Sequence, residues 1–406
     1  MKNADLTLCL SGGGFRAALF HLGALRRLNE LGILSQVDAV SAVSGGSMLA
    51  SHLAKHIVAG ERDHIPWPRP ARQWAGFDAM AREFHAKVAK HLPIATLLSY
   101  DEVFFRKLPK GFKKWVGDMR LSDLPERPTF IFNATELRRG HVWSFTKATI
   151  GNEHFGYSTS HQEMSVVEAV AASACFPAFD QLRARVRSAD FSGGREKDRP
   201  TECEILFTDG GVFDNLGLEA VASSRIILVS DGGRNAQASG MTNDTRLLLT
   251  TPSSMNAPAG SQWEALRWIL SGESRNPDVH KGRLLLLQRR LMTKEVDGAY
   301  WSIGDGSETR QAGVTLGYSQ ALAEELIASV RTQLDAFSEA ERQVLDNHGY
   351  LVADGQVRVY APQLITIDAA LAVPWPKALS EHFVRKALRH SHNISSGARA
   401  LKRLLS

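Results

Sequence analysis

Two apolar runs near the N-terminus each end at glycines and lead at once into a helical pattern. Residues 6–10 read L-T-L-C-L, and the turn S-G-G-G at 11–14 separates them from apolar residues that recur at helical spacing as far as Gly32. Residues 37–43 read V-D-A-V-S-A-V, and the turn S-G-G at 44–46 precedes a second helical run. The pattern predicts two successive strand–turn–helix units, with glycine-rich turns at the carboxyl ends of both strands.

The rest of the chain keeps alternating between helical and strand-like spacing. A serine at 338 followed by a glutamate at 341 has the spacing of a capping box and predicts a helix start. The polar and charged residues 183–200 predict an exposed loop. The predicted helices are 71–92, 165–173, 263–270, 318–337 and 338–347, and the predicted strands are 129–133, 142–146, 203–207 and 225–230.

Strands that alternate with helices are typical of α/β proteins. We therefore predict a mainly parallel central sheet between helices, within one large domain at residues 1–376. The chemical motifs occupy residues 6–235 of this domain, and residues 236–376 add C-terminal helices. A P-W-P tripeptide marks the point where a basic tail, residues 377–406, leaves the domain.

The composition is that of a soluble globular protein, with 406 residues, 44% of them hydrophobic and 22% charged. No apolar run approaches the roughly 18 residues needed to span a bilayer, and no secretory leader precedes the first strand. Three cysteines, Cys9, Cys175 and Cys203, form neither a disulfide framework nor a Cys/His cluster. We expect a cytoplasmic protein with no structural zinc, no other metal and no cofactor.

Basic residues gather in two places, although the net charge is only +5. From Lys377 onward seven basic residues face one acid, Glu381. The segment that begins at Val103 and ends at Val116 has five basic residues, four aromatic residues and no acid. Both regions suit peripheral contact with anionic lipid headgroups. A solvated helix face and an ordinary loop are the structural alternatives, and no nucleic-acid-binding signature accompanies them.

The turn at Gly12, Gly13 and Gly14 is suited to holding an anion, because glycine amides are unobstructed and a helix N-terminus adds its positive dipole end. One interpretation is an oxyanion hole. Another is dinucleotide binding, since G-G-G-F-R-A fits G-x-G-x-x-A and Asp38 lies about the right distance along the chain for a ribose partner. The acid should follow the second strand, however, whereas Asp38 stands near its start. We therefore favour the oxyanion hole.

Ser44 lies between a predicted strand and a predicted helix, which is the arrangement of a nucleophile elbow. Such a turn strains the serine backbone and presents its Oγ at the edge of the sheet. The usual G-x-S-x-G pattern has glycine where this chain has Ala42, which adds only a Cβ. Without a partner for the serine, the same pattern is an ordinary turn.

A carboxylate to accept the serine proton is predicted at Asp209, which follows the strand at 203–207 and precedes two glycines. Asp231 has the same D-G-G context after the strand at 225–230 and remains an alternative. We prefer Asp209 because Asn215 and the helix after it give its turn further structure. His21 lies near the glycine loop and would allow a histidine triad instead, but its helix neighbours face the core.

Three motifs in this order resemble those of the patatin-like phospholipases. They are the S-G-G-G-F-R-A loop, the serine elbow about thirty residues later and the distal D-G-G. The S-G-G-S elbow at Ser44 and the loop residue Arg16 are also similar to the catalytic domain of cytosolic phospholipase A2. With the helix end at 172–177 and the N-A-T tripeptide at 133–135, the similarity covers residues 6–235.

The resemblance implies a lipid acyl hydrolase of phospholipase A type, which cleaves carboxylic esters of membrane phospholipids through an acyl-enzyme. Ser44 would be the nucleophile and Asp209 the general base, without a histidine. The amides of Gly13 and Gly14, helped by that of Gly45, would bind the oxyanion. Arg16 would contact the substrate phosphate or steady the glycine loop. A nucleotide-binding enzyme, a Ser-His-Asp esterase and an adaptor with a dead site are the alternatives.

Overall fold

The computed structural model describes residues 5–391 with gaps, and every structural statement below concerns the described residues. Most of the basic and aromatic segment at 103–116 lies outside them, as do the predicted helix at 263–270 and residues 392–406 of the predicted tail. The gaps are 69, 91–99, 102–107, 110–115, 138, 162, 176–181, 197–199, 234–286, 288–289, 292–294, 312–313 and 333.

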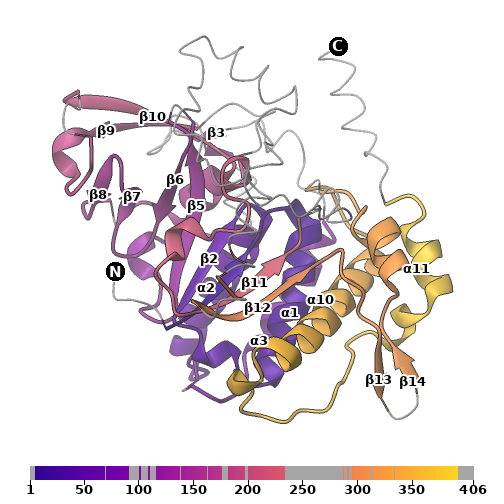
Figure 1. Ribbon diagram of the computed structural model, residues 1–406. Coiled ribbons are helices and arrows are strands. Elements are labelled where there is room, and N and C mark those ends of the chain that lie inside the picture. The colour runs from indigo at the N-terminus through magenta and orange to yellow at the C-terminus, as the bar shows by residue number, and fades with distance from the viewer. Residues whose placement is uncertain are drawn as a thin grey trace.

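A ten-stranded sheet forms the centre of the molecule (Figure 1). Its five parallel strands lie side by side in the order β12 (Asp297–Ser302), β11 (Ile226–Asp231), β1 (Leu6–Leu10), β2 (Ala39–Val43) and β5 (Thr129–Glu136). Antiparallel strands extend the β5 side of the sheet. They are β6 (His141–Phe145), β7 (Ile150–Asn152), β8 (Gly156–Ser158), β10 (Glu202–Thr208) and β9 (Leu182–Arg187).

Helices cover one face of the parallel strands, and they include two long ones that directly follow β1 and β2. The helices are α1 (Gly14–Glu30), α2 (Gly45–Arg62), α3 (Phe77–Val88), α6 (Val166–Ser173), α9 (Gln320–Leu322), the π-helical turn η6 (Ala323–Ile327), α10 (Glu339–Tyr360) and α11 (Glu381–Leu388). Short 3-10 turns lie at Leu34–Gln36, Leu121–Asp123, Ser188–Asp190, Gly210–Val212, Glu219–Val221, Pro362–Leu364 and Pro376–Leu379. Two small hairpins pair β3 (Tyr100–Asp101) with β4 (Leu108–Pro109) and β13 (Thr309–Gln311) with β14 (Val314–Leu316).

Alternate residues of the parallel strands face two separate apolar clusters, as period-two side-chain alternation requires. Leu8 and Leu10 of β1 face the large cluster beneath the helices, whereas Cys9 faces a small cluster on the opposite side. Leu216 and Val221, which follow the second glycine motif, cover that opposite side. The fold is therefore the predicted α/β arrangement with a mainly parallel core and additional C-terminal helices.

The predicted loop at 183–200 is wrong, because its first part is the strand β9, which pairs with β10. Leu182, Ala184 and Val186 are buried while the intervening side chains are arginines that face outward. This is the alternation of a half-buried strand, and the high charge of its polar face concealed it. The predicted helix at 318–337 is likewise shorter, since α9 and η6 end at Ile327.

The helix predicted after Ser338 is confirmed, with its capping box intact. The amide of Glu341 donates to Ser338 Oγ over 3.2 Å, and the Ser338 amide donates to Glu341 Oε2 over 2.7 Å. Beyond it, residues 377–391 of the predicted tail pack on the body. Val384 and Leu388 of α11 are buried there.

None of the described helices combines the length and the apolar character needed to cross a bilayer.

Helices α1 and α10 cross through a pair of glycines that bring their backbones into direct contact (Figure 1). A Cβ on Gly23 of α1 would overlap the Asp346 carbonyl oxygen, and a Cβ on Gly349 of α10 would overlap the Phe20 carbonyl oxygen. Each glycine therefore fits against the backbone of the other helix. The close approach holds α1 against the C-terminal half of the chain.

We expect Gly349→Ala to destabilise the fold by about 2 kcal/mol or more, because its methyl group would force the two helices apart. Gly355→Ala on the same helix is the matched control, since a Cβ there has no neighbour within 4 Å. That change should stabilise the protein by about 0.5–1 kcal/mol through helix propensity. Denaturant unfolding midpoints of the wild type and the two variants measure both effects. Equal midpoints for the two variants would contradict a close backbone contact between α1 and α10 at Gly349.

Candidate active site

Ser44 occupies a strained turn between β2 and α2. Strand β2 ends at Val43, α2 begins at Gly45, and Ser44 between them has φ 50° and ψ −116°. Non-glycine residues with positive φ are uncommon, and such strain costs on the order of 1–3 kcal/mol. Ala42, which replaces the first glycine of the usual pattern, is completely buried and fits without displacing the turn. The backbone at Ser44 has the geometry expected of a nucleophile elbow.

The two glycines after Ser44 are required by close backbone contacts. A Cβ on Gly45 would overlap the carbonyl oxygen of Gly14, and a Cβ on Gly46 would overlap that of Leu10. The first turn of α2 therefore rests directly on the loop between β1 and α1. This contact brings the N-termini of the two long helices together beside Ser44.

Ser173, at the end of α6, holds the elbow from the other side. The Ser44 amide donates to Ser173 Oγ over 2.9 Å, and this hydroxyl in turn donates to the carbonyl oxygen of Asn133 over 2.6 Å. The hydroxyl of Ser47 lies 2.8 Å from Ser173 Oγ. Nothing in the local sequence singles out Ser173, because its partners come from two distant segments, at 44–47 and at 133.

The glycine loop leads into the start of α1, beside the first turn of α2. Gly13 and Gly14 have φ values of 137° and 59°, which only glycine adopts readily, and α1 begins at Gly14. The first amides of a helix have no acceptor within the helix. Those of Gly13 and Gly14 in α1 and of Gly45 in α2 therefore lie where two helix dipoles converge, which favours a negative charge.

Arg16 is buried beneath the loop, with only 4% of its surface exposed. Its guanidinium donates to the carbonyl oxygen of Gly232 over 3.1 and 3.2 Å, and to those of Ala328 and Val330 over 2.9 Å each. A Cβ on Gly14 would overlap the Thr332 carbonyl oxygen of the same segment. Through these bonds Arg16 ties the start of α1 to Gly232 and to the segment at 328–332.

Asp209 follows β10, which pairs with β5 and is thus two strands away from β2. Its amide donates to Cys175 O over 2.8 Å, and its carbonyl oxygen accepts from Thr135 Oγ1 over 3.0 Å. The carboxylate Oδ1 accepts from the Gly211 amide over 2.8 Å. Asp209 and Ser44 are each 9% exposed, so both carry their polar atoms just beneath the surface.

The side chain of Asn215 lies close to the glycines of the loop and of both D-G-G motifs, since a Cβ on Gly233 would also lie 2.7 Å from its Nδ2. A Cβ on Gly12 would overlap Asn215 Oδ1 and would lie 3.2 Å from Ser44 Cβ. A Cβ on Gly211 would lie 2.5 Å from the same Oδ1 and 3.0 Å from Asp209 Oδ1. The Asn215 carbonyl oxygen also accepts from the Gly12 amide over 3.1 Å. Glycines of both motifs thus surround one amide side chain, which joins the two motifs.

The alternative carboxylate, Asp231, is completely buried at the end of β11. It accepts from the Gly233 amide and from Tyr300 Oη, both over 2.9 Å. Burial and the neighbouring Asp231 carboxylate raise the pKa of Tyr300 well above its usual value, so the tyrosine keeps its proton. Asp231 therefore serves as an acceptor between β11 and β12, on the far side of β1 from the elbow.

His21 is a structural residue within the core. Its Nδ1 lies 2.7 Å from Ser230 Oγ and its Nε2 lies 2.9 Å from the Ser11 carbonyl oxygen. Burial lowers its pKa to about 4, so the ring is neutral at physiological pH. Both ring nitrogens are engaged in links between β1 and β11, which gives no support to a triad through His21.

Asp38, the residue expected to bind a ribose, lies at the opposite edge of the sheet. Its carboxylate accepts from the amides of Asp5 and Leu6 and pairs with Arg127 over 2.9 Å. It is therefore at the amino end of β2, whereas the glycine loop is at the carboxyl end of β1. Asp38 therefore does not lie beside the glycine loop, and the dinucleotide interpretation has no acidic residue there to bind the ribose.

A mixed sheet with a parallel core, a strained serine after one strand and a glycine-rich helix start after its neighbour are together the arrangement of the α/β hydrolase type. The chain belongs to the patatin-like phospholipase family, whose profile matches residues 8–222, just over half of its length. No curated protein sequence matches it.

Solved structures that align with this chain include the following two. Human GIVD cytosolic phospholipase A2 aligns with a TM-score of 0.43 and 11% identity over 96% of this chain and 63% of its own. VipD from Legionella pneumophila aligns with a TM-score of 0.26 and 14% identity over 57% of this chain and 50% of its own. The chain thus spans less than two thirds of either structure.

We expect Ser173→Ala to lower ester hydrolysis about tenfold, because the buried Ser44 amide would lose its acceptor, a loss worth about 1–3 kcal/mol. Ser51→Ala is the matched control, since the Ser51 hydroxyl bonds only to Met48 O of its own helix. Initial rates on a short-chain p-nitrophenyl ester measure the effect. Equal rates for the two variants would show that Ser173 does not hold the elbow.

Proposed function

We propose that this protein is a phospholipase of the A type, which cleaves carboxylic esters of membrane phospholipids through a Ser44–Asp209 dyad and an acyl-enzyme. The observation that carries the proposal is the strained Ser44 turn, which lies beside two converging helix N-termini. Gly12 and Gly211 both lie against the side chain of Asn215, so the glycine loop and the turn after Asp209 are neighbours. This proximity supports the pairing of Ser44 with Asp209.

In the proposed reaction Asp209 takes the Ser44 proton as Oγ attacks the ester carbonyl carbon. The carbonyl oxygen becomes an oxyanion held by the amides of Gly13, Gly14 and Gly45. Asp209 then gives the proton to the leaving alkoxide, which departs as a lysolipid. In the second half Asp209 deprotonates a water molecule that attacks the acyl carbon, and the proton passes to Ser44 Oγ as the fatty acid is released. General-base catalysis contributes roughly 10²- to 10⁴-fold and an oxyanion donor about 10²- to 10³-fold.

The proposed reaction assigns Arg16 a positioning role. Its bonds to Gly232, Ala328 and Val330 clamp the start of α1 to two distant segments. A substrate phosphate would therefore be recognised elsewhere. Peripheral membrane contact through residues 103–116 and the tail at 377–406, in a cytoplasmic protein, is proposed on their charge and aromatic content alone.

We expect Ser44→Ala to abolish release of fatty acid from phospholipid vesicles, and Asp209→Asn to reduce it at least 10³-fold, since the amide cannot accept the serine proton. Asp231→Asn is the matched control, because it alters the other D-G-G aspartate, and it should retain most activity once its folding is verified. Mass spectrometry of the lipid products measures all three. Unchanged product from Ser44→Ala would overturn the proposal, and loss only in Asp231→Asn would transfer the base role to that residue.

We further expect Asn215→Ala to lower kcat at least tenfold without a comparable change in KM. The side chain holds the two motifs at their separation, and a small displacement of catalytic groups has a large effect on rate. Asn215→Asp keeps the size of the side chain but adds a negative charge beside Asp209. Its kcat should therefore be no higher than that of Asn215→Ala. Steady-state kinetics on the short-chain p-nitrophenyl ester measure kcat and KM separately. A normal kcat in Asn215→Ala would show that the two motifs do not need this side chain.

A further inference from the structure

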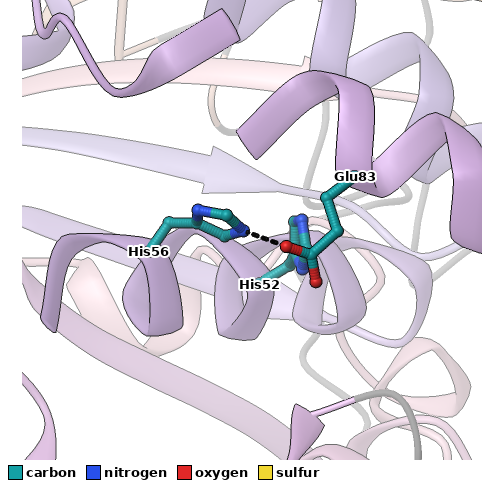
Figure 2. Close-up of side chains that lie close together, drawn as sticks. All are labelled: His52, His56 and Glu83. Carbon is teal, nitrogen blue, oxygen red and sulfur yellow. Dashed lines mark hydrogen bonds and ion pairs between the residues drawn. The ribbon is translucent and has the colours of Figure 1, made fainter. Parts of the chain in front are cut away.

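A cluster of two histidines and a glutamate lies between α2 and α3, away from the catalytic elbow (Figure 2). His52 and His56 are one helical turn apart on α2, and Glu83 faces them from α3. One ligand atom from each of the three lies within 4.8 Å of the others. His52 is eight residues from Ser44, which is about 12 Å along a helix.

His52 is held in the protonation state that a metal ligand needs. Its Nε2 lies 3.1 Å from the Met80 carbonyl oxygen, so the ring donates its single proton there. Its Nδ1 is completely buried and has no hydrogen-bond partner. A histidine bonded to a backbone carbonyl through one nitrogen has the other nitrogen oriented for a cation.

The two carboxylate oxygens of Glu83 have different neighbours. Oε2 lies 2.9 Å from His56 Nε2, on the side of the histidines. Oε1 pairs with the ammonium groups of Lys55 and Lys87, each over 3.1 Å. A cation at Oε2 would replace the proton that His56 Nε2 and Oε2 share, while Oε1 keeps its lysines.

We propose that His52 Nδ1, His56 and Glu83 Oε2 form a binding site for a zinc-type divalent cation that links α2 to α3. Two imidazoles and one carboxylate are a ligand set typical of zinc, with a fourth position open to water. The buried, unpartnered Nδ1 is the observation that distinguishes this site from a simple ion-pair cluster. The lysines lower the affinity of the site, since their charges oppose that of the cation.

The site is separate from the proposed hydrolysis. Its ligands lie on the second and third turns of α2 and on α3, whereas the elbow is at the N-terminus of α2. A cation there would restrain the helix that positions Ser44 and would supply no group to the reaction. Its test is therefore a binding measurement, whose outcome does not depend on ester hydrolysis.

We expect the tag-free protein, stripped with EDTA, to bind one equivalent of Zn²⁺ by isothermal titration calorimetry and to unfold at a higher temperature with the metal. His56→Ala and Glu83→Gln should each weaken binding at least tenfold. His64→Ala is the matched control, because His64 is exposed just beyond α2. Binding that is absent, or equally strong in His56→Ala and wild type, would overturn the proposal.

Lys55→Met separates the metal site from a mere ion-pair cluster. Removal of one opposing charge should strengthen zinc binding several-fold, although it removes a partner of Glu83. An ion-pair cluster predicts instead no zinc binding in either protein. A second test uses the wild type alone, loaded with Co²⁺ and measured by visible absorption spectroscopy. Absorption bands of tetrahedral cobalt would support the site, and a spectrum identical to that of free Co²⁺ would refute it.

Discussion

The carbonyl oxygen of Gly14 and the backbone of Gly45 touch without any side chain between them. Strands β1 and β2 are parallel neighbours in which Leu10 pairs with Ala42, so the turns after them are level at one edge of the sheet. The glycine contact then brings the first turns of α1 and α2 together. The proposed oxyanion hole depends on this contact, because it decides where the helix-end amides lie relative to Ser44.

The two long helices carry the effects of this contact into the rest of the molecule. Arg16 ties the start of α1 to the segment at 328–332, and the Gly23–Gly349 crossing fixes its middle against α10. Helix α2 begins with the elbow and presents the histidine–glutamate cluster two turns later. A site held on packed helices stays in place, which is what catalysis by positioned amides requires.

Local patterns were sufficient for much of the fold. The glycine turns that follow β1 and β2, each leading into a helix, lie where predicted. So does the capping box at Ser338. Each of these features is encoded within a few residues. The predictions failed where a pattern was ambiguous in isolation. The arginines of β9 concealed a strand that becomes evident only once it pairs with β10, and η6 ends its helix early where the chain turns to receive Arg16.

The sequence by itself determined the α/β class, the elbow at Ser44, the glycine loop and two candidate carboxylates, because each depends on the conformational preferences of neighbouring residues. Only the tertiary structure decided that Arg16 binds backbone carbonyls, that Asp231 is held by Tyr300 and that Asn215 and Ser173 surround the elbow. It also brought His52, His56 and Glu83 together. These relations join residues far apart along the chain, and they arise from the packing of buried polar groups that must find partners, which no local pattern records.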